Sequence, residues 1–179
     1  MKKFLISLFL IIVTGCSISA NATPKQKVEE FLNKYKMEHT NVIDQLKDTI
    51  ESAFDNDDYK ERYNTLMLNQ YKSMEYKITD EIVEENTAVV EVEVTVLNYG
   101  SAITNADDYL STHADEFQND KKELDNDSFQ DYKLSLMEKV TDTVDYKIEF
   151  NLTKNDKGEW EIDSLSDTDL EKLHGIYVE

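Results

Sequence analysis

The sequence predicts an α+β fold: a four-stranded curved antiparallel sheet, with N-terminal helices packed on one face and a helical insertion between the second and third strands. Two alternating stretches indicate the strands. Valine occupies every second position from Val90 to Val96, and apolar residues alternate with polar ones from Val144 to Leu152. A period of two turns one side of a strand toward a core and the other toward water. Apolar residues at helical spacing between positions 28 and 71 supply the covering helices.

The residues before the first strand predict three amphipathic helices. Thr23 suits an N-cap, Pro24 suits the first helical position, and Gln26 completes a capping box. Apolar residues then repeat at helical spacing in three runs, separated by a break near 37–40 and a polar break at 55–58. The runs are Val28, Phe31, Leu32 and Tyr35; Val42, Ile43, Leu46, Ile50, Ala53 and Phe54; and Tyr59, Tyr63, Leu66, Met67 and Tyr71.

A hairpin is predicted after the third helix. Apolar and polar residues alternate from Met74 to Ile78, and this first strand extends to Val83. A turn at Glu85–Asn86 returns the chain as the valine strand, so the two strands are expected to pair.

The second half adds an insertion and a second hairpin. Residues 101–140 return to helical spacing around a polar loop at 119–127. A turn at 155–158 carries glycine where a positive φ is expected, and it leads to a last strand with Trp160 and Ile162. Ser166 then caps a short helix that Gly175 ends.

The charge of the chain excludes one class of function. The 179 residues include 19 basic and 38 acidic ones, a formal net charge of −19. Such a surface repels the phosphates of nucleic acids and of anionic lipid head groups. We therefore expect no nucleic-acid partner, and any attachment to a membrane requires a covalent or apolar anchor.

The N-terminus has the pattern of an export signal. Two lysines precede an apolar run, Phe4–Val13, that is too short to span a bilayer. The run leads into Val13-Thr14-Gly15-Cys16, which resembles the lipobox of bacterial lipoproteins. The resemblance implies that the thiol of Cys16 is diacylglycerylated and that Cys16 becomes the new N-terminus after cleavage. Two or more acyl chains, such as palmitate, hold a protein stably at a membrane.

Ordinary signal-peptide cleavage is the alternative, because Ala20-Asn21-Ala22 fits an A-x-A site that would release a free secreted protein. We expect lipidation instead, since ordinary cleavage leaves the single cysteine without a role. The expected organisation is a lipoprotein signal peptide at 1–15, the lipidated cysteine and a tether at 16–22, and one α+β domain at 23–179.

The order of elements resembles the nuclear-transport-factor-2-like, or cystatin-like, fold. The resemblance rests on the N-terminal helices leading into an antiparallel sheet and on the ending Gly158-Glu159-Trp160-Glu161-Ile162-Asp163. More narrowly, the chain is similar to small bacterial lipoproteins of uncharacterised function. They share the lipobox, a proline-led helix, an alternating strand like Ala88–Leu97 and a helical insertion. In this chain the insertion is long enough to cover the open face of the sheet.

The sequence assigns no catalytic, cofactor-binding or metal residue. His39, His113 and His174 are far apart and lack metal-binding spacing, although Asp115 and Glu116 follow His113 closely. No G-x-S-x-G elbow activates a serine, and four scattered glycines form no phosphate loop. We therefore expect no cofactor.

Two acidic stretches invite a comparison with calcium loops. Asp55-Asn56-Asp57-Asp58 begins like an EF-hand, but Lys60 and Leu66 occupy the positions that require glycine and a bidentate glutamate. Asp125-Asn126-Asp127 fails in the same way. Both stretches suit loops and helix caps better, with weak, nonspecific cation binding as the alternative.

The chain has ten tyrosines, and five of them fall on predicted inner faces, where they either pack in the core or line a pocket. We favour core packing, because no aspartate can be matched to the base of a steroid-isomerase-like site. The five are Tyr35, Tyr63, Tyr71, Tyr76 and Tyr146.

Taken together, these features predict a lipid-anchored, non-catalytic domain on the outer face of the cell membrane that binds an envelope protein or a small ligand. Two alternatives remain open at this stage. One is an enzyme or small-molecule carrier that uses a pocket between the sheet and the first helices, and the other is an acidic, cation-responsive surface protein.

Overall fold

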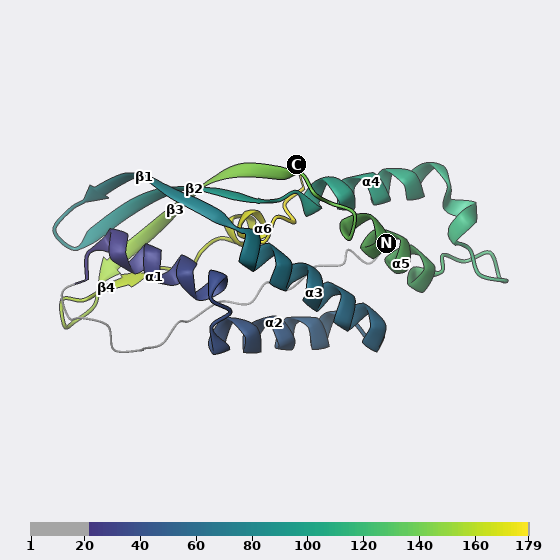
Figure 1. Cartoon of the computed structure of the whole chain (residues 1–179), viewed down its shortest axis with the longest axis horizontal. Coiled ribbons are helices and arrows are strands. Elements are labelled where there is room, and N and C mark those ends of the chain that lie inside the picture. The colour runs from purple at the N-terminus through teal and green to yellow at the C-terminus, as the bar shows by residue number, and fades with distance from the viewer. Residues whose placement is uncertain (1–21, 179) are drawn as a thin grey trace.

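The computed structural model describes residues 22–178, and these form the predicted α+β fold (Figure 1). Six α-helices, one short 3-10 helix and four strands follow one another in that part of the chain. Their bounds are α1 (Pro24–Lys36), α2 (Thr40–Ala53), α3 (Asp57–Ser73), β1 (Glu75–Val83), β2 (Thr87–Leu97), α4 (Tyr99–Thr112), η1 (Ala114–Phe117), α5 (Asn126–Met137), β3 (Thr143–Lys154), β4 (Trp160–Ile162) and α6 (Asp167–Leu173).

The four strands form one antiparallel sheet in the order β1-β2-β3-β4. The valine strand β2 lies inside the sheet and pairs along its full length with β3, from Thr87 opposite Thr153 to Leu97 opposite Thr143. The valines at positions 90, 92, 94 and 96 are buried, as the alternation predicts, and β3 buries Ile148, Phe150 and Leu152 beside them.

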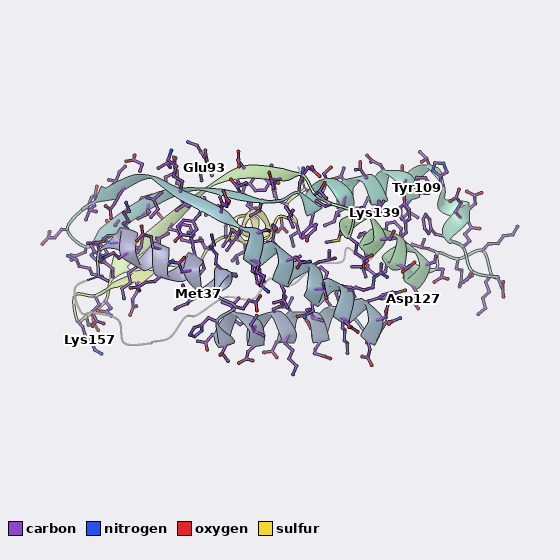
Figure 2. All side chains as sticks on the ribbon, in the orientation of Figure 1. Met37, Glu93, Tyr109, Asp127, Lys139 and Lys157 are labelled. Atoms are coloured by element: carbon purple, nitrogen blue, oxygen red, sulfur yellow. The ribbon has the colours of Figure 1, made fainter. Side chains whose placement is uncertain are left out.

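Helices cover one face of this sheet. Helix α1 packs on β1, β2 and β4, α3 packs on β2, and α6 packs on β3. In the layer between α1 and the sheet, the ring of Phe31 meets that of Phe150 edge-on, with centroids 5.6 Å apart. The opposite face is open to solvent and carries mostly charged and hydroxyl side chains, and Figure 2 shows Glu93 on the side away from the helices.

The helix starts follow the predicted capping chemistry. The Thr23 hydroxyl accepts a hydrogen bond from the Gln26 N–H, and the Gln26 side chain accepts one from the Thr23 N–H, so the capping box is complete. The side chains of Asn56 and Asp125 cap α3 and α5, and Ser166 caps α6. The two acidic stretches are therefore helix starts, as the sequence favoured.

A bulge in β1 changes which residues face the helices. The pairing with β2 shifts between Ile78 and Asp80, so Glu81 comes opposite the inward-facing Val90. The Glu81 carboxylate then accepts a hydrogen bond from the backbone N–H of Lys25 at 3.0 Å. Lys25 lies in the first turn of α1, where N–H groups lack helical partners and a negative charge is favourable. The bulge thus joins the end of β1 to the start of α1.

Gln70 is the buried polar side chain in the described core, and it joins α3 to the end of β2. Its Oε1 accepts the Leu97 N–H at 2.8 Å, and its Nε2 donates to the Leu97 carbonyl at 3.3 Å. The pairing of β1 begins at Glu75 opposite Thr95, so no β1 residue reaches Leu97. The Gln70 amide therefore continues the β1–β2 hydrogen bonding by one residue and satisfies the half-buried N–H and carbonyl of Leu97.

The helical insertion falls between β2 and β3, as predicted, but it does not pack where its length would allow. Instead of covering the open sheet face, α4 packs on α5, and α5 packs on α3, beyond the end of the sheet (Figure 1). Arg62, the one arginine of the chain, joins α3 to α5. Its Nε bonds Glu138 Oε1 at 2.6 Å, its Nη2 bonds Glu138 Oε2 at 3.2 Å, and its Nη1 bonds Asp131. Charged bidentate bonds of this kind position the insertion against α3.

The C-terminal segment closes the same region. Gly175 ends α6 with a φ of +69°, donating to the Lys172 carbonyl while Ile176 donates to that of Glu171, which is a Schellman ending. The Gly175 carbonyl accepts the Gly100 N–H at 2.8 Å. A Cβ on Gly175 would overlap Gln70 Nε2 and the Leu97 carbonyl oxygen. Helix α3, strand β2 and the C-terminal segment therefore meet at one tightly packed junction.

Two glycine substitutions separate the effect of backbone conformation from that of packing. Gly175→Ala forces alanine into the left-handed backbone conformation and also makes its Cβ overlap Gln70 and Leu97. We therefore expect it to lower the free energy of unfolding by about 3 kcal/mol or more. Gly158→Ala is the matched control, because Gly158 also has a positive φ, +76°, but nothing lies within 4 Å of its added Cβ. We expect about 1 kcal/mol there. Urea unfolding of both variants measures the difference, and equal losses would show that the junction is loosely packed.

Candidate functional site

Cys16, the one residue to which the sequence assigns a modification, lies outside the described residues, as do the leader and most of the tether. Lipidation therefore stays a prediction. Among residues 22–178, no helix is both long enough and apolar enough to cross a membrane.

The three histidines lie in separate parts of the fold. The His39 Nδ1 accepts the Asn41 N–H at 3.4 Å, so this residue caps α2. His113 follows the last turn of α4, and its ring stacks flat on that of Tyr109, with centroids 4.0 Å apart. His174 is the half-buried C-cap of α6. Among the described residues, no group of three or more histidine, cysteine, aspartate or glutamate side chains has the geometry of a metal site.

The acidic stretches are engaged in local structure. The Asn56 side chain accepts the Asp58 N–H at 2.9 Å, and the Asp125 carboxylate accepts the N–H groups of Asp127 and Ser128. Asp57 also forms an ion pair with Lys60 at 3.3 Å. These contacts explain the residue types without a bound cation.

A tyrosine–histidine cluster is formed by the buried Tyr35 and Tyr71 and the half-buried His174. The ring centroids lie 5.1 Å apart for the two tyrosines, and 5.9 Å and 5.7 Å from His174 to Tyr35 and Tyr71. The three residues come from α1, α3 and the end of α6. Tyr35 is 2% exposed, and its hydroxyl has no hydrogen-bond partner among the described residues.

Burial keeps every member of this cluster neutral. It raises the pKa of the Tyr35 phenol, and it raises that of Tyr71 together with the neighbouring Tyr35 and Tyr63. Burial also raises the pKa of Tyr63 to about 12 and lowers the pKa of His174 to about 4. The lower dielectric of the interior disfavours both phenolate and imidazolium. At neutral pH the cluster therefore carries no charge.

The cluster packs the core. The packed edge-on and tilted rings match the geometry that stabilises aromatic side chains in cores. Tyr35, Tyr71, Phe31, Phe150 and Trp160 all belong to one buried group between the helices and the sheet. These side chains fill the space in which the carrier alternative places its pocket.

A second aromatic cluster lies at the tip of the insertion, where η1 contacts both α4 and α5. The ring of Phe117 meets those of Phe129 and Tyr132, each with centroids 5.4 Å apart, and Tyr132 meets Tyr109 at 5.1 Å. The Tyr109 hydroxyl donates to Glu116 at 2.9 Å. Figure 2 places Tyr109 on α4 near this tip. The cluster gives the insertion a small core of its own, separate from that under the sheet.

The five tyrosines that the sequence predicts on inner faces lie in different environments in the structure. It brings Tyr35 and Tyr71 together, with Tyr63 beside Phe54 at 5.3 Å. Tyr76 is half-buried and donates to Asn33, whereas Tyr146 lies against Tyr177. His174 is the member that sequence reasoning missed. Its spacing from Leu170, on the apolar face of the last helix, was the available signal.

Comparisons with known proteins identify no family. No family model matches the sequence, and no curated protein matches it either. One crystal structure, of the Bacillus subtilis subsp. subtilis str. 168 protein YcdA, provisionally described as a lipoprotein, aligns with a TM-score of 0.35 and 16% identity. The alignment covers 88% of this chain and 48% of that one, so this chain spans about half its length. A likeness of this degree fixes neither a fold family nor a function.

The half-buried His174 predicts a loss of stability in mild acid. Its folded pKa, about 4, lies below the ordinary value of 6.5, so the unfolded chain takes up a proton that the folded chain refuses. Stability is therefore full above about pH 6.5 and falls as the pH drops toward 4, by up to roughly 3 kcal/mol.

Urea unfolding of the wild type and of His174→Phe, from about pH 7 to about pH 4, measures this loss as the difference between their two slopes. His39→Gln, at an exposed position, is the comparison, and His174→Phe should change the slope more than His39→Gln does. Equal slopes for the wild type and His174→Phe would show that His174 takes up a proton as readily in the folded chain as in the unfolded one.

Proposed function

We propose that this protein is a lipid-anchored, extracytoplasmic, non-catalytic domain that binds a protein or small ligand at the cell envelope. Residues 1–15 act as a lipoprotein signal peptide, Cys16 carries the lipid, and 16–22 tether the single domain at 23–179. The domain then stands on the outer face of the cell membrane.

The observation that carries the proposal is the sequence Val13-Thr14-Gly15-Cys16 at the end of a short apolar run preceded by two lysines. An apolar run of this length suits an export signal and not a membrane span. The chain has one cysteine, and it occupies the position that the modification requires.

The interior supports a non-catalytic role. Buried aromatic and branched side chains occupy the layer between α1 and the sheet, and the titratable groups there are neutral. A partner therefore meets the outside of the domain, where acidic side chains predominate.

The tether limits how the domain stands on the membrane. Seven residues, 16–22, reach at most about 25 Å when fully extended. Helix α1 begins at Pro24, next to Glu81 at the far end of β1. A tether of this length therefore holds the end of the domain that carries the β1–β2 turn close to the membrane.

Replacement of the cysteine tests the anchor. In a bacterial host, Cys16→Ala should move the full chain from the membrane pellet into the soluble or uncleaved precursor fraction, because it removes the acylated thiol. Ser17→Ala is the control and should stay with the membrane. Mass spectrometry of the wild-type N-terminal peptide should find an acylated Cys16. An unmodified mature chain that begins at Thr23 would contradict the proposal.

A further inference from the structure

Strand β1 lies at the edge of the sheet opposite β4 and pairs only with β2 within residues 22–178 (Figure 1). The Glu84 N–H donates to the Thr87 carbonyl at 2.8 Å. Because the direction of hydrogen bonding alternates along a strand, the N–H of Val83 points away from β2. The edge of β1 is thus a template for another strand.

The two halves of β1 differ in how they are covered. Near its start, Tyr76 lies under α1, where its hydroxyl donates to Asn33 at 3.1 Å and its ring faces Lys36. Toward its end, Ile82 is 59% exposed and Val83 is 52% exposed. Because consecutive residues of a strand point to opposite faces, these two side chains expose apolar surface on both sides of the strand end.

The charge along this edge restricts its occupant. Between positions 75 and 85 lie five acidic residues and one lysine. The Glu81 carboxylate already accepts the Lys25 N–H at the start of α1, and the Asp80 carboxylate accepts the N–H of Glu81 at 2.8 Å. Glu75 and the two glutamates of the turn are exposed. A second copy of this chain has a net charge of −19 and would place its acidic side chains opposite those of β1. Like charges on paired strands are destabilising, so a second copy fits this edge poorly.

We propose that the free edge of β1 binds an extended segment of a partner protein as a fifth strand, and that this segment alternates basic and apolar residues. Main-chain hydrogen bonds supply the affinity, and the alternate side chains supply the choice of partner. The apolar residues of the segment cover Ile82 and Val83, and its lysines or arginines face the acids. This inference specifies the binding half of the proposed function and rests on it, but it does not depend on the lipid anchor.

A short synthetic peptide of alternating lysine and valine, with blocked ends, is the probe. The full chain in detergent micelles should bind it in a fluorescence-anisotropy titration. The same peptide with glutamate in place of lysine should bind at least about tenfold more weakly, because it opposes acid to acid. Hydrogen exchange should show new protection of the Val83 amide when the lysine peptide is bound.

A matched pair of variants locates the binding on the strand edge. Val83→Pro removes the outward N–H and leaves the pairing with β2, since proline is tolerated on an edge strand. It should weaken binding of the lysine peptide by about tenfold or more. Val83→Thr keeps the N–H and a branched side chain and should bind as the wild type does. Unchanged far-ultraviolet circular dichroism of both variants shows that they are folded.

Three outcomes would overturn the inference: no binding of the lysine peptide, equal binding by Val83→Pro, or equal binding of the acidic peptide. A concentration-dependent dimer that protects the Val83 amide and is lost in Val83→Pro would assign the edge to a second copy instead. Membrane fractionation of Cys16→Ala tests the anchor separately, so failure of the anchor and failure of the edge are distinguishable.

Discussion

The side-chain amide of Gln70 satisfies the last backbone pair of β2, and the arrangement of the domain depends on this contact. β2 pairs with β3 along its whole length, but β1 does not reach its final residue, Leu97. Gln70 takes the two unpaired groups of Leu97 by reaching from α3. An unpaired backbone group in this position would cost free energy comparable to a lost hydrogen bond. The contact fixes α3 against the sheet, and Gly175 lets the C-terminal segment close over both.

Much of this fold could be predicted from the sequence, because its strands and helices have clean periods. The alternating valines and the cap at Thr23 need only local rules, and both appear where expected. The Gln70 contact could not be predicted, since a glutamine on an amphipathic helix normally faces water. The insertion lies between β2 and β3, as predicted, but its packing against α3 could not be predicted: Arg62 meets Glu138 across 76 positions of sequence, and no local pattern encodes that pair.

The candidate sites also divide into contacts between sequence neighbours, which could be predicted, and contacts between distant residues, which could not. The capping roles of Asn56 and Asp125 depend on near neighbours in sequence and were predicted. The cluster of Tyr35, Tyr71 and His174 joins three distant helices, so sequence could indicate only that the tyrosines faced inward. That cluster is neutral and packed, whereas one sheet face and the end of the β1 edge are exposed. Function on this scaffold is therefore expected outside the core.

Replacement of Gln70 is the most direct test of the account. In Gln70→Leu the volume is nearly kept, but the N–H and carbonyl of Leu97 lose their partner in a buried site. We expect the free energy of unfolding to fall by about 2–4 kcal/mol and the Leu97 amide to exchange much faster. A Gln70→Leu variant within about 0.5 kcal/mol of the wild type, with the Leu97 amide still protected, would contradict the account.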